Sequence, residues 1–279
     1  MIDIDEVARA ARRLDPLPVS VTRLATLVGD GTPELADIID LVQYDQALTA
    51  TLLRTANSSW SASRVEITTV KDAVVRLGAG PVLSLALAVD LRGRMQHAIP
   101  EYGLAEGELW DHSVASMLAA EAVARRSAGA VPPDAATAAL LHDVGKLVMA
   151  RFLSPDVLLA LRDAQGDGGT RRAAELEVLG IDHAELGALI AQAWGLPPGL
   201  VRAIARHHQP GAGETASAAV HVADVVAKTI GLQLDDNPDM DTYGTAAATL
   251  GLDGAGFEAL CTRVAGQFEE LRARFALPV

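Results

Sequence analysis

The strongest constraint on the fold is a series of histidine and acidic residues in the second half of the sequence. Six of the seven histidines lie between His112 and His221, among acidic residues that share their preference for divalent cations. The candidate ligands are Glu108, His112, His142, Asp143, His183, His207, His208 and Asp224. Because these residues are widely spaced, only a fold in which several segments converge could bring them together. Their order suits a metal-binding helical bundle.

The rest of the composition favours helices. Half of the residues are hydrophobic but only 4% are aromatic, so the core must consist mainly of alanine, leucine and valine. Alanine and leucine are among the strongest helix formers. We therefore expect an all-α protein, in which only residues 65–68 have the composition of a strand.

Prolines and capping residues divide the chain into helical segments. Pro16 and Pro18 disfavour a helix and predict an extended segment near the start of the chain. Asp45 and Thr69 are placed to cap the first turns of two helices. Gly78 is placed to end the second of these helices.

A division into two regions is expected near residue 100, where Pro100 and Gly103 interrupt the helical pattern. Residues 1–100 would form an N-terminal helical bundle. Residues 101–279 would form a second helical domain that carries the candidate metal site and the C-terminal helices.

The spacing within the second region places candidate ligands on shared helix faces. Glu108 and His112 are four residues apart in a helix predicted over residues 106–126, so both should face one metal cluster. His142 and Asp143 are expected near the middle of another helix, where adjacent side chains point about 100° apart. The imidazole could then bind one ion while the carboxylate bridges to a second.

The residues around the His-Asp pair predict chemistry on phosphate esters. Lys146 lies three residues after Asp143, so its ammonium could hold a substrate phosphate beside the metals. Bound metals would lower the pKa of a water molecule and stabilise phosphoryl oxygens. Asp143 and Lys146 are therefore the candidate catalytic residues. His221, three residues before Asp224, is expected in the core or in a supporting position.

Charge and hydropathy restrict the partners and the location. The net charge of −13 argues against a general nucleic-acid binder, because phosphate backbones repel such a surface. The longest apolar run, residues 81–89, is too short to cross a bilayer, and the first residues do not resemble a signal peptide. A single cysteine, Cys261, suits a reducing compartment. We expect a cytoplasmic protein without membrane insertion.

The sequence resembles the HDOD family, a bacterial signalling branch of the HD phosphohydrolase superfamily. The resemblance covers roughly residues 14–224 and rests on several sequence blocks in the expected order. The blocks read LDPLP, ELADIIDLVQYDQALTATLLRTANSS, ITTVKDAVVRLG, WDHS, LLHDVGK, GIDHAELGALIAQAWGLP and RHHQP. This resemblance implies an all-helical fold in which an N-terminal helical bundle packs against an HD-type helical domain.

The candidate ligand set is also similar to the metal shell of the HD-GYP cyclic di-GMP phosphodiesterases. Lys146 matches their phosphate-contacting lysine. The chain departs from that subfamily after His208, where it reads QPGAGETASAAVHVAD, with no Gly-Tyr-Pro segment and a shorter path to Asp224. This departure argues against recognition of cyclic di-GMP in the manner of that subfamily.

Three functions remain open. HDOD proteins generally act as interaction modules, which predicts a bacterial protein that works mainly through contacts with other signalling proteins. Its metal centre would hold iron or manganese, with two or more ions possible. The intact ligand set and Lys146 predict instead a metal-dependent phosphohydrolase or phosphodiesterase acting on a nucleotide or cyclic dinucleotide. The many imidazoles are also compatible with a redox-responsive di-iron sensor.

Overall fold

Helices joined by short loops make up the described part of the chain. The computed structural model describes residues 4–29, 34–57, 66–127, 131–166, 169–234 and 240–275. The expected all-α class is confirmed: within these ranges the β-type pairing is limited to an isolated bridge between Ile99 and Leu104. Residues 66–68 form no strand, and residue 65 lies outside the described residues.

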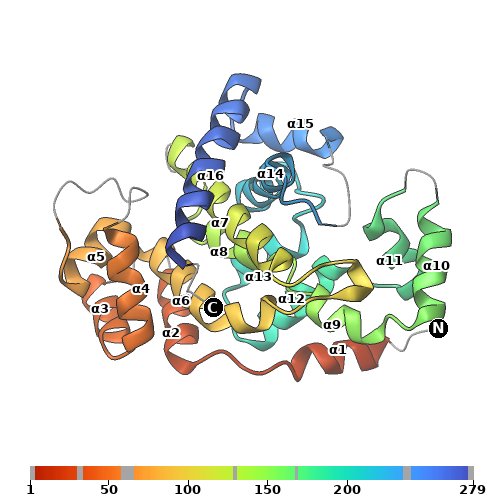
Figure 1. Cartoon of the computed structure of the whole chain (residues 1–279), viewed down its shortest axis with the longest axis horizontal. Helices are drawn as coiled ribbons and strands as arrows, with labels where there is room; N and C mark the ends of the chain where they lie inside the picture. The colour runs from red at the N-terminus through yellow and green to blue at the C-terminus, as the bar shows by residue number, and fades with distance from the viewer. Residues whose placement is uncertain are drawn as a thin grey trace.

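The first half of the chain forms a bundle of short helices (Figure 1). Its helices are α2 (Val19–Gly29), α3 (Leu35–Gln43), α4 (Gln46–Ala56), α5 (Val70–Leu77) and α6 (Ala79–Met95). α6 contacts α2, α4 and α5, and its leucines Leu83, Leu87 and Leu91 are fully buried. The bundle is therefore organised around one apolar helix.

Local capping interactions set several helix ends in this bundle, as the sequence predicts. Asp45 and Thr69 accept hydrogen bonds from backbone N–H groups in the first turns of α4 and α5. Gly78 ends α5 with φ at 87°, a conformation that favours glycine. At the end of α4, the side chain of Asn57 bonds to both the backbone N–H and the carbonyl of Ile67. Asn57 thus links the end of α4 to the residues that precede α5.

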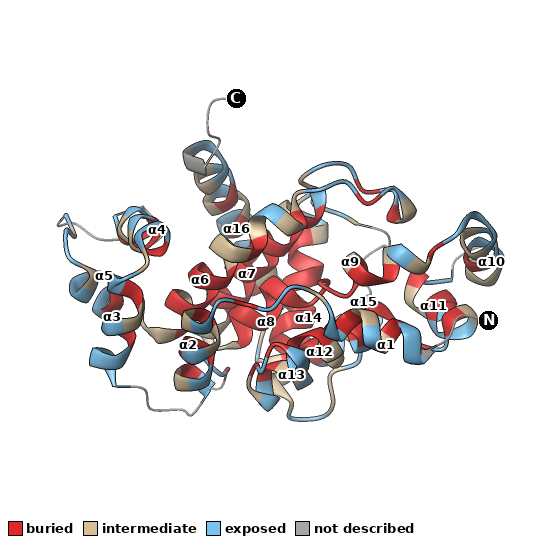
Figure 2. Ribbon diagram, turned by 90° about the horizontal axis from the view of Figure 1, so that it is seen from below, coloured by how far each residue is buried: buried red, intermediate tan, exposed pale blue. Residues whose placement is uncertain are grey.

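The second half is built around two long buried helices, α7 and α14 (Figure 2). α7 packs against α8, α14 and α16, so it is the central helix of this half. The helices of this half are α7 (Glu108–Arg126), α8 (Ala135–Leu141), α9 (Lys146–Met149), α10 (Pro155–Gln165), α11 (Arg171–Leu179), α12 (His183–Ala193), α13 (Pro198–Ala205), α14 (Thr215–Thr229), α15 (Met240–Thr249) and α16 (Gly254–Phe275).

The N-terminal helix α1 (Ile4–Arg12) packs against the second half, on α12 and α9. Residues 15–18 then run as the predicted extended segment towards α2. The carbonyl of Asp15 accepts hydrogen bonds from Arg94 Nη1 at 2.6 Å and from Trp194 Nε1 at 3.1 Å. The segment is therefore tied to both halves of the chain.

The two halves share one continuous core. α6 lies against α8, and a Cβ atom at Gly80 would come within 2.2 Å of the carbonyl oxygen of Pro133. The hydroxyls of Ser84 and Thr137 form a buried hydrogen bond of 2.9 Å across this contact. The predicted division near residue 100 remains a prediction.

Within the described ranges, no single helix is both long and apolar enough to cross a membrane. α5 and α6 reach the required length and composition only together, and they meet at an angle of 112°.

Candidate metal centre

Seven of the predicted ligands meet in the interior of the second half. Six of these side chains are buried, and His208 is partly exposed. They are His112 of α7, His142 and Asp143 between α8 and α9, His183 at the start of α12, His207 and His208 after α13, and Asp224 of α14.

The His-Asp pair lies at a break between two helices, and its expected place in mid-helix is wrong. α8 ends at Leu141, and hydrogen bonds from residue i to i−3 link Val144 to Leu141 and Lys146 to Asp143 before α9 continues. This tighter winding turns both side chains of the pair towards the same interior.

A glycine at this break allows the chain to pack closely against α12. A Cβ atom at Gly145 would lie 2.0 Å from the carbonyl oxygen of His183 and 2.7 Å from the backbone nitrogen of Gly187. No side chain fits between the turn and α12. Gly145 therefore allows the His-Asp pair to approach the helix that carries His183.

Hydrogen bonds at the outer ring nitrogens orient four of the imidazoles. The Nδ1 atoms of His112, His142 and His207 lie 2.7–2.8 Å from backbone carbonyl oxygens. The Nδ1 atom of His183 lies 2.7 Å from a carboxylate oxygen of Glu175. Because each acceptor requires a proton on Nδ1 in the neutral ring, the Nε2 atoms carry lone pairs.

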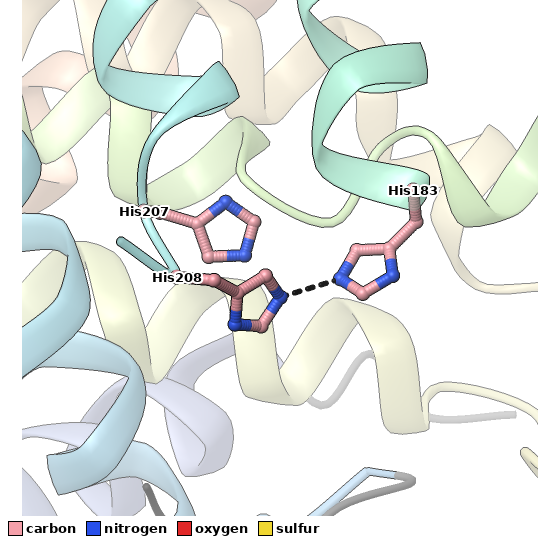
Figure 3. A group of neighbouring side chains, drawn as sticks. All are labelled: His183, His207 and His208. Carbon is pink, nitrogen blue, oxygen red and sulfur yellow. Dashed lines mark hydrogen bonds between the residues drawn. The ribbon is translucent and has the colours of Figure 1, made fainter. Parts of the chain in front are cut away.

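These Nε2 atoms converge. Those of His112 and His142 are 3.2 Å apart, and those of His183 and His208 are 2.8 Å apart (Figure 3 shows the latter pair). Figure 3 also shows the ring of His207 beside that of His208, and the two ring centroids lie 4.0 Å apart. The lone pairs of His112 and His142 repel each other at this distance unless a cation or a proton lies between them.

Two carboxylates complete the group of donors. Asp143 reaches His142 Nε2 at 3.4 Å with one oxygen and His183 Nε2 at 3.3 Å with the other. Asp224 Oδ1 lies 3.2 Å from His112 Nε2. Asp143 is thus placed between two groups of imidazoles, as expected of a carboxylate that could bridge two ions.

The donor set fits a divalent cation. Three overlapping triads have donor atoms within 4.8 Å of one another: His183, His207 and His208; His112, His142 and Asp224; and His142, Asp143 and His207. The Nε2 atom of His207 is buried without a hydrogen-bond partner. An unpartnered buried acceptor is unfavourable in a protein interior, and a metal ion would satisfy it. Imidazole and carboxylate ligands suit zinc, iron and manganese.

Glu108 is not brought into this group. It is the first residue of α7, its side chain is exposed, and its carboxylate accepts a hydrogen bond from the backbone N–H of Ala105 at 2.8 Å. At the start of a helix an acidic side chain can reach the free N–H groups of the preceding loop. The four-residue spacing to His112 therefore does not bring Glu108 to the cluster.

Two lysines neutralise the two aspartates. Lys146 Nζ lies 2.9 Å from Asp143 Oδ2, and Lys228 Nζ lies 3.0 Å from Asp224 Oδ2. Both ammonium groups are largely buried. Lys228 was not predicted from the sequence. Its position four residues after Asp224 on one helix could have predicted this ion pair.

Glu175 was also missed. It is fully buried, and it accepts hydrogen bonds from the backbone N–H of His183 and from the hydroxyl of Tyr102 at 2.8 Å. Burial alone would raise its pKa, but the His183 ring and these donors lower the pKa to about 2. No local spacing signals this residue, because it acts across the turn between α11 and α12.

His221 has the supporting position expected for it. It is buried, and its Nδ1 atom lies 2.8 Å from the backbone carbonyl oxygen of His207. This contact holds the loop that carries His207 and His208 against α14.

The electrostatics of Asp143, Asp224, His207 and His208 match the requirements of metal ligands. Burial alone would raise the pKa of Asp143 and Asp224, but Lys146 and Lys228 respectively, together with nearby imidazoles, lower both well below the usual range. Burial and neighbouring imidazoles lower the pKa of His207 and His208 well below the usual value. Ionised carboxylates and neutral imidazoles are the forms that bind metals.

The chain matches the family model of the HDOD domain over residues 14–210. Among curated proteins it is 26% identical over 206 residues to an uncharacterised protein of Treponema pallidum. That match covers 72% of this chain but only 39% of the length of the relative. The family match includes the cluster residues up to His208 and excludes Asp224 and Lys228.

Solved structures have the same fold. A candidate phosphohydrolase from Shewanella amazonensis is 26% identical, with a TM-score of 0.69, and the match covers 97% of this chain and 98% of the other. An HDOD domain protein of unknown function from Geobacter sulfurreducens is 23% identical, with a TM-score of 0.73, and the match covers 99% and 100% of the two chains.

Proposed function

The chain belongs to the HDOD family, and from this premise we propose that it is a bacterial cytoplasmic signal-transduction protein with a divalent-metal centre. It acts mainly through contacts with other proteins. Iron or manganese occupies the cluster, and two or more ions can be held because two of the triads, His183-His207-His208 and His112-His142-Asp224, have no residue in common. The convergence of Nε2 lone pairs on two ionised aspartates is the observation that carries this proposal.

The metal links segments that are distant in the sequence. His112, His142, His183, His207 and Asp224 each come from a different helix or loop. A cation bound among them therefore holds α7, α12 and α14 in one arrangement. Its loss would loosen these contacts and change the surface that a partner recognises.

Elemental analysis of the purified protein tests the metal centre. We expect at least one equivalent of iron, manganese or zinc in the wild-type protein and a large loss in Asp143→Asn. His97→Ala is the matched control, because His97 is an exposed histidine outside the cluster. Failure of the wild-type protein to bind any of these metals would contradict the proposal.

Pull-down experiments test the interaction role. Proteins captured from the source bacterium by the wild-type chain should be lost or reduced with Asp143→Ala and retained with His97→Ala. An unchanged set of partners would show that the metal centre is not needed for these interactions.

A second candidate function is hydrolysis of a phosphodiester in a nucleotide or cyclic dinucleotide. The two lysines favour it, since Lys146 and Lys228 place ammonium groups beside Asp143 and Asp224. The similarity to the candidate phosphohydrolase from Shewanella amazonensis also supports this function. When bound, the metal would supply a hydroxide-forming water and Lewis acidity. Lys146 would contact a phosphoryl oxygen, and Asp143 would help to hold the metal.

Turnover of bis-p-nitrophenyl phosphate and of cyclic dinucleotides, after anaerobic loading with iron or manganese, tests this second function. Lys146→Met should reduce the rate at least about tenfold, as expected for the loss of a charge contact in the transition state. Lys71→Met, at an exposed lysine of α5, should leave the rate unchanged. Activity that survives Asp143→Asn would show that another site is responsible.

A further inference from the structure

A cavity lies between the two halves of the chain, apart from the histidine cluster. It has a volume of about 230 Å³ and is lined by α4 and α6 of the first half and by α7 and the C-terminal part of α16. In Figure 1, α16 runs down towards α6. None of the seven converging ligands lines the cavity, but Asp111, which does, directly precedes His112 on α7.

The floor of this cavity is mostly apolar. Its buried apolar side chains are Leu85 of α6, Val114, Met117 and Leu118 of α7, and Phe268 of α16, and two buried threonines of α4, Thr51 and Thr55, lie beside them. The partly buried indole of Trp110 adds an aromatic surface. Such a lining favours a ligand with an apolar or aromatic body.

The rim is positively charged. Arg54, Arg92 and Arg272 come from three different helices, and Asp111 is the single carboxylate among the lining residues. A local excess of positive charge is notable in a chain whose net charge is −13. Arginine is well suited to bind carboxylate, sulfonate or phosphate groups through several N–H donors.

We propose that this cavity binds a small organic anion with a compact apolar or aromatic body. The anionic group lies at the rim among Arg54, Arg92 and Arg272, and the body contacts the floor formed by Val114, Met117 and neighbouring residues.

Titration with 1-anilinonaphthalene-8-sulfonate tests the proposal, because this fluorescent probe combines one sulfonate with an aromatic body. We expect one molecule to bind per folded chain with blue-shifted emission. Octanoate and naphthalene-2-carboxylate are then added as competitors with flexible and planar bodies. Displacement by either supports the site and identifies the body it prefers. Failure of both to displace the probe would overturn the proposal.

Two variants of cavity residues and one control variant test whether the probe binds in this cavity. Ala88→Trp should abolish binding, because Ala88 lines the cavity and an indole there would fill it. Arg272→Gln should weaken binding about three- to tenfold, as expected for a partly exposed ionic contact. Arg76→Gln removes the same charge from an exposed position on α5, outside the cavity, and should leave binding unchanged.

Two results would contradict this assignment. One is wild-type affinity in a folded Ala88→Trp variant. The other is equal weakening by Arg272→Gln and Arg76→Gln, which would indicate a general charge effect. If Ala88→Trp does not fold, the two arginine variants decide, because both positions are exposed.

Discussion

The two halves of the chain are packed from similar aliphatic residues but differ in the polar groups that they bury. Among the described residues of the first half, the buried polar side chains are Thr51, Thr55 and Ser84, none of which is charged. The second half buries many ionisable side chains: His112, Glu121, His142, Asp143, Lys146, Arg171, Glu175, Asp182, His183, His207, His221 and Asp224.

Packing alone therefore does not account for the ionisable side chains that the second half buries. Removing a charge from water is costly, and well-packed apolar residues can often replace buried ion pairs without loss of stability. The described part of the first half has the same helical architecture without a buried charged residue. The ionisable groups that converge in the second half are therefore better explained by the proposed metal centre than by packing.

The largest expected effect tests the apolar packing of the first half. Leu52→Ala removes a fully buried side chain and should lower the free energy of unfolding by about 2–5 kcal/mol. The loss should be the same with and without a chelator, as measured by urea denaturation. Leu35→Ala, at an exposed leucine, is the control. A chelator-dependent loss would show that the first half also depends on the metal.

A smaller effect is expected for Glu175→Gln in the second half. The substitution weakens charge-assisted hydrogen bonds to His183 and Tyr102 and should cost about 2 kcal/mol. It should also weaken cobalt binding about 10- to 100-fold, because Glu175 orients the ring of His183. Glu177→Gln, at an exposed position of the same helix, should change neither quantity. Unchanged cobalt affinity in Glu175→Gln would show that Glu175 does not support metal binding.

The contact between the halves should contribute less. A double-mutant cycle of Ser84→Ala and Thr137→Val isolates their buried hydrogen bond, whose coupling energy should be about 1 kcal/mol. Urea denaturation of the four proteins measures it. A coupling energy of zero would mean that the halves do not interact through this bond.

The smallest expected effect concerns Asp134, before α8. Burial raises its pKa, so the folded state binds this proton more tightly than the unfolded state. Stability should therefore fall as pH rises through the folded-state pKa. Asp134→Asn should remove this dependence and stabilise the protein at pH 7 by less than about 1 kcal/mol.

The exposed Asp156→Asn controls for the loss of one negative charge. A pH profile of unfolding for Asp134→Asn that matches the wild type would refute the explanation by burial.

Helix ends were predictable where the signal is local. Asp45, Thr69 and Gly78 act on residues within one turn of themselves, so their roles follow from the order of the sequence. The break at His142 was not predictable in this way. It depends on the close approach of Gly145 to α12, a contact between segments that are far apart in the chain.

The same distinction between local signals and long-range contacts applies to the candidate site. The type and order of its histidines and aspartates, together with the family resemblance, identified most of the converging residues. Glu108 was misplaced because helical spacing does not reveal that a side chain at a helix start caps the loop before it. Glu175 was missed because its contacts with Tyr102 and His183 form only when α11, α12 and the segment that carries Tyr102 fold together.

Anomalous X-ray diffraction from crystals loaded anaerobically with iron or manganese would locate the bound ions. We expect at least one strong peak among the Nε2 atoms of His112, His142 and His207 and the carboxylates of Asp143 and Asp224. An absence of anomalous density there, with the imidazoles still in the present arrangement, would contradict the proposed metal centre.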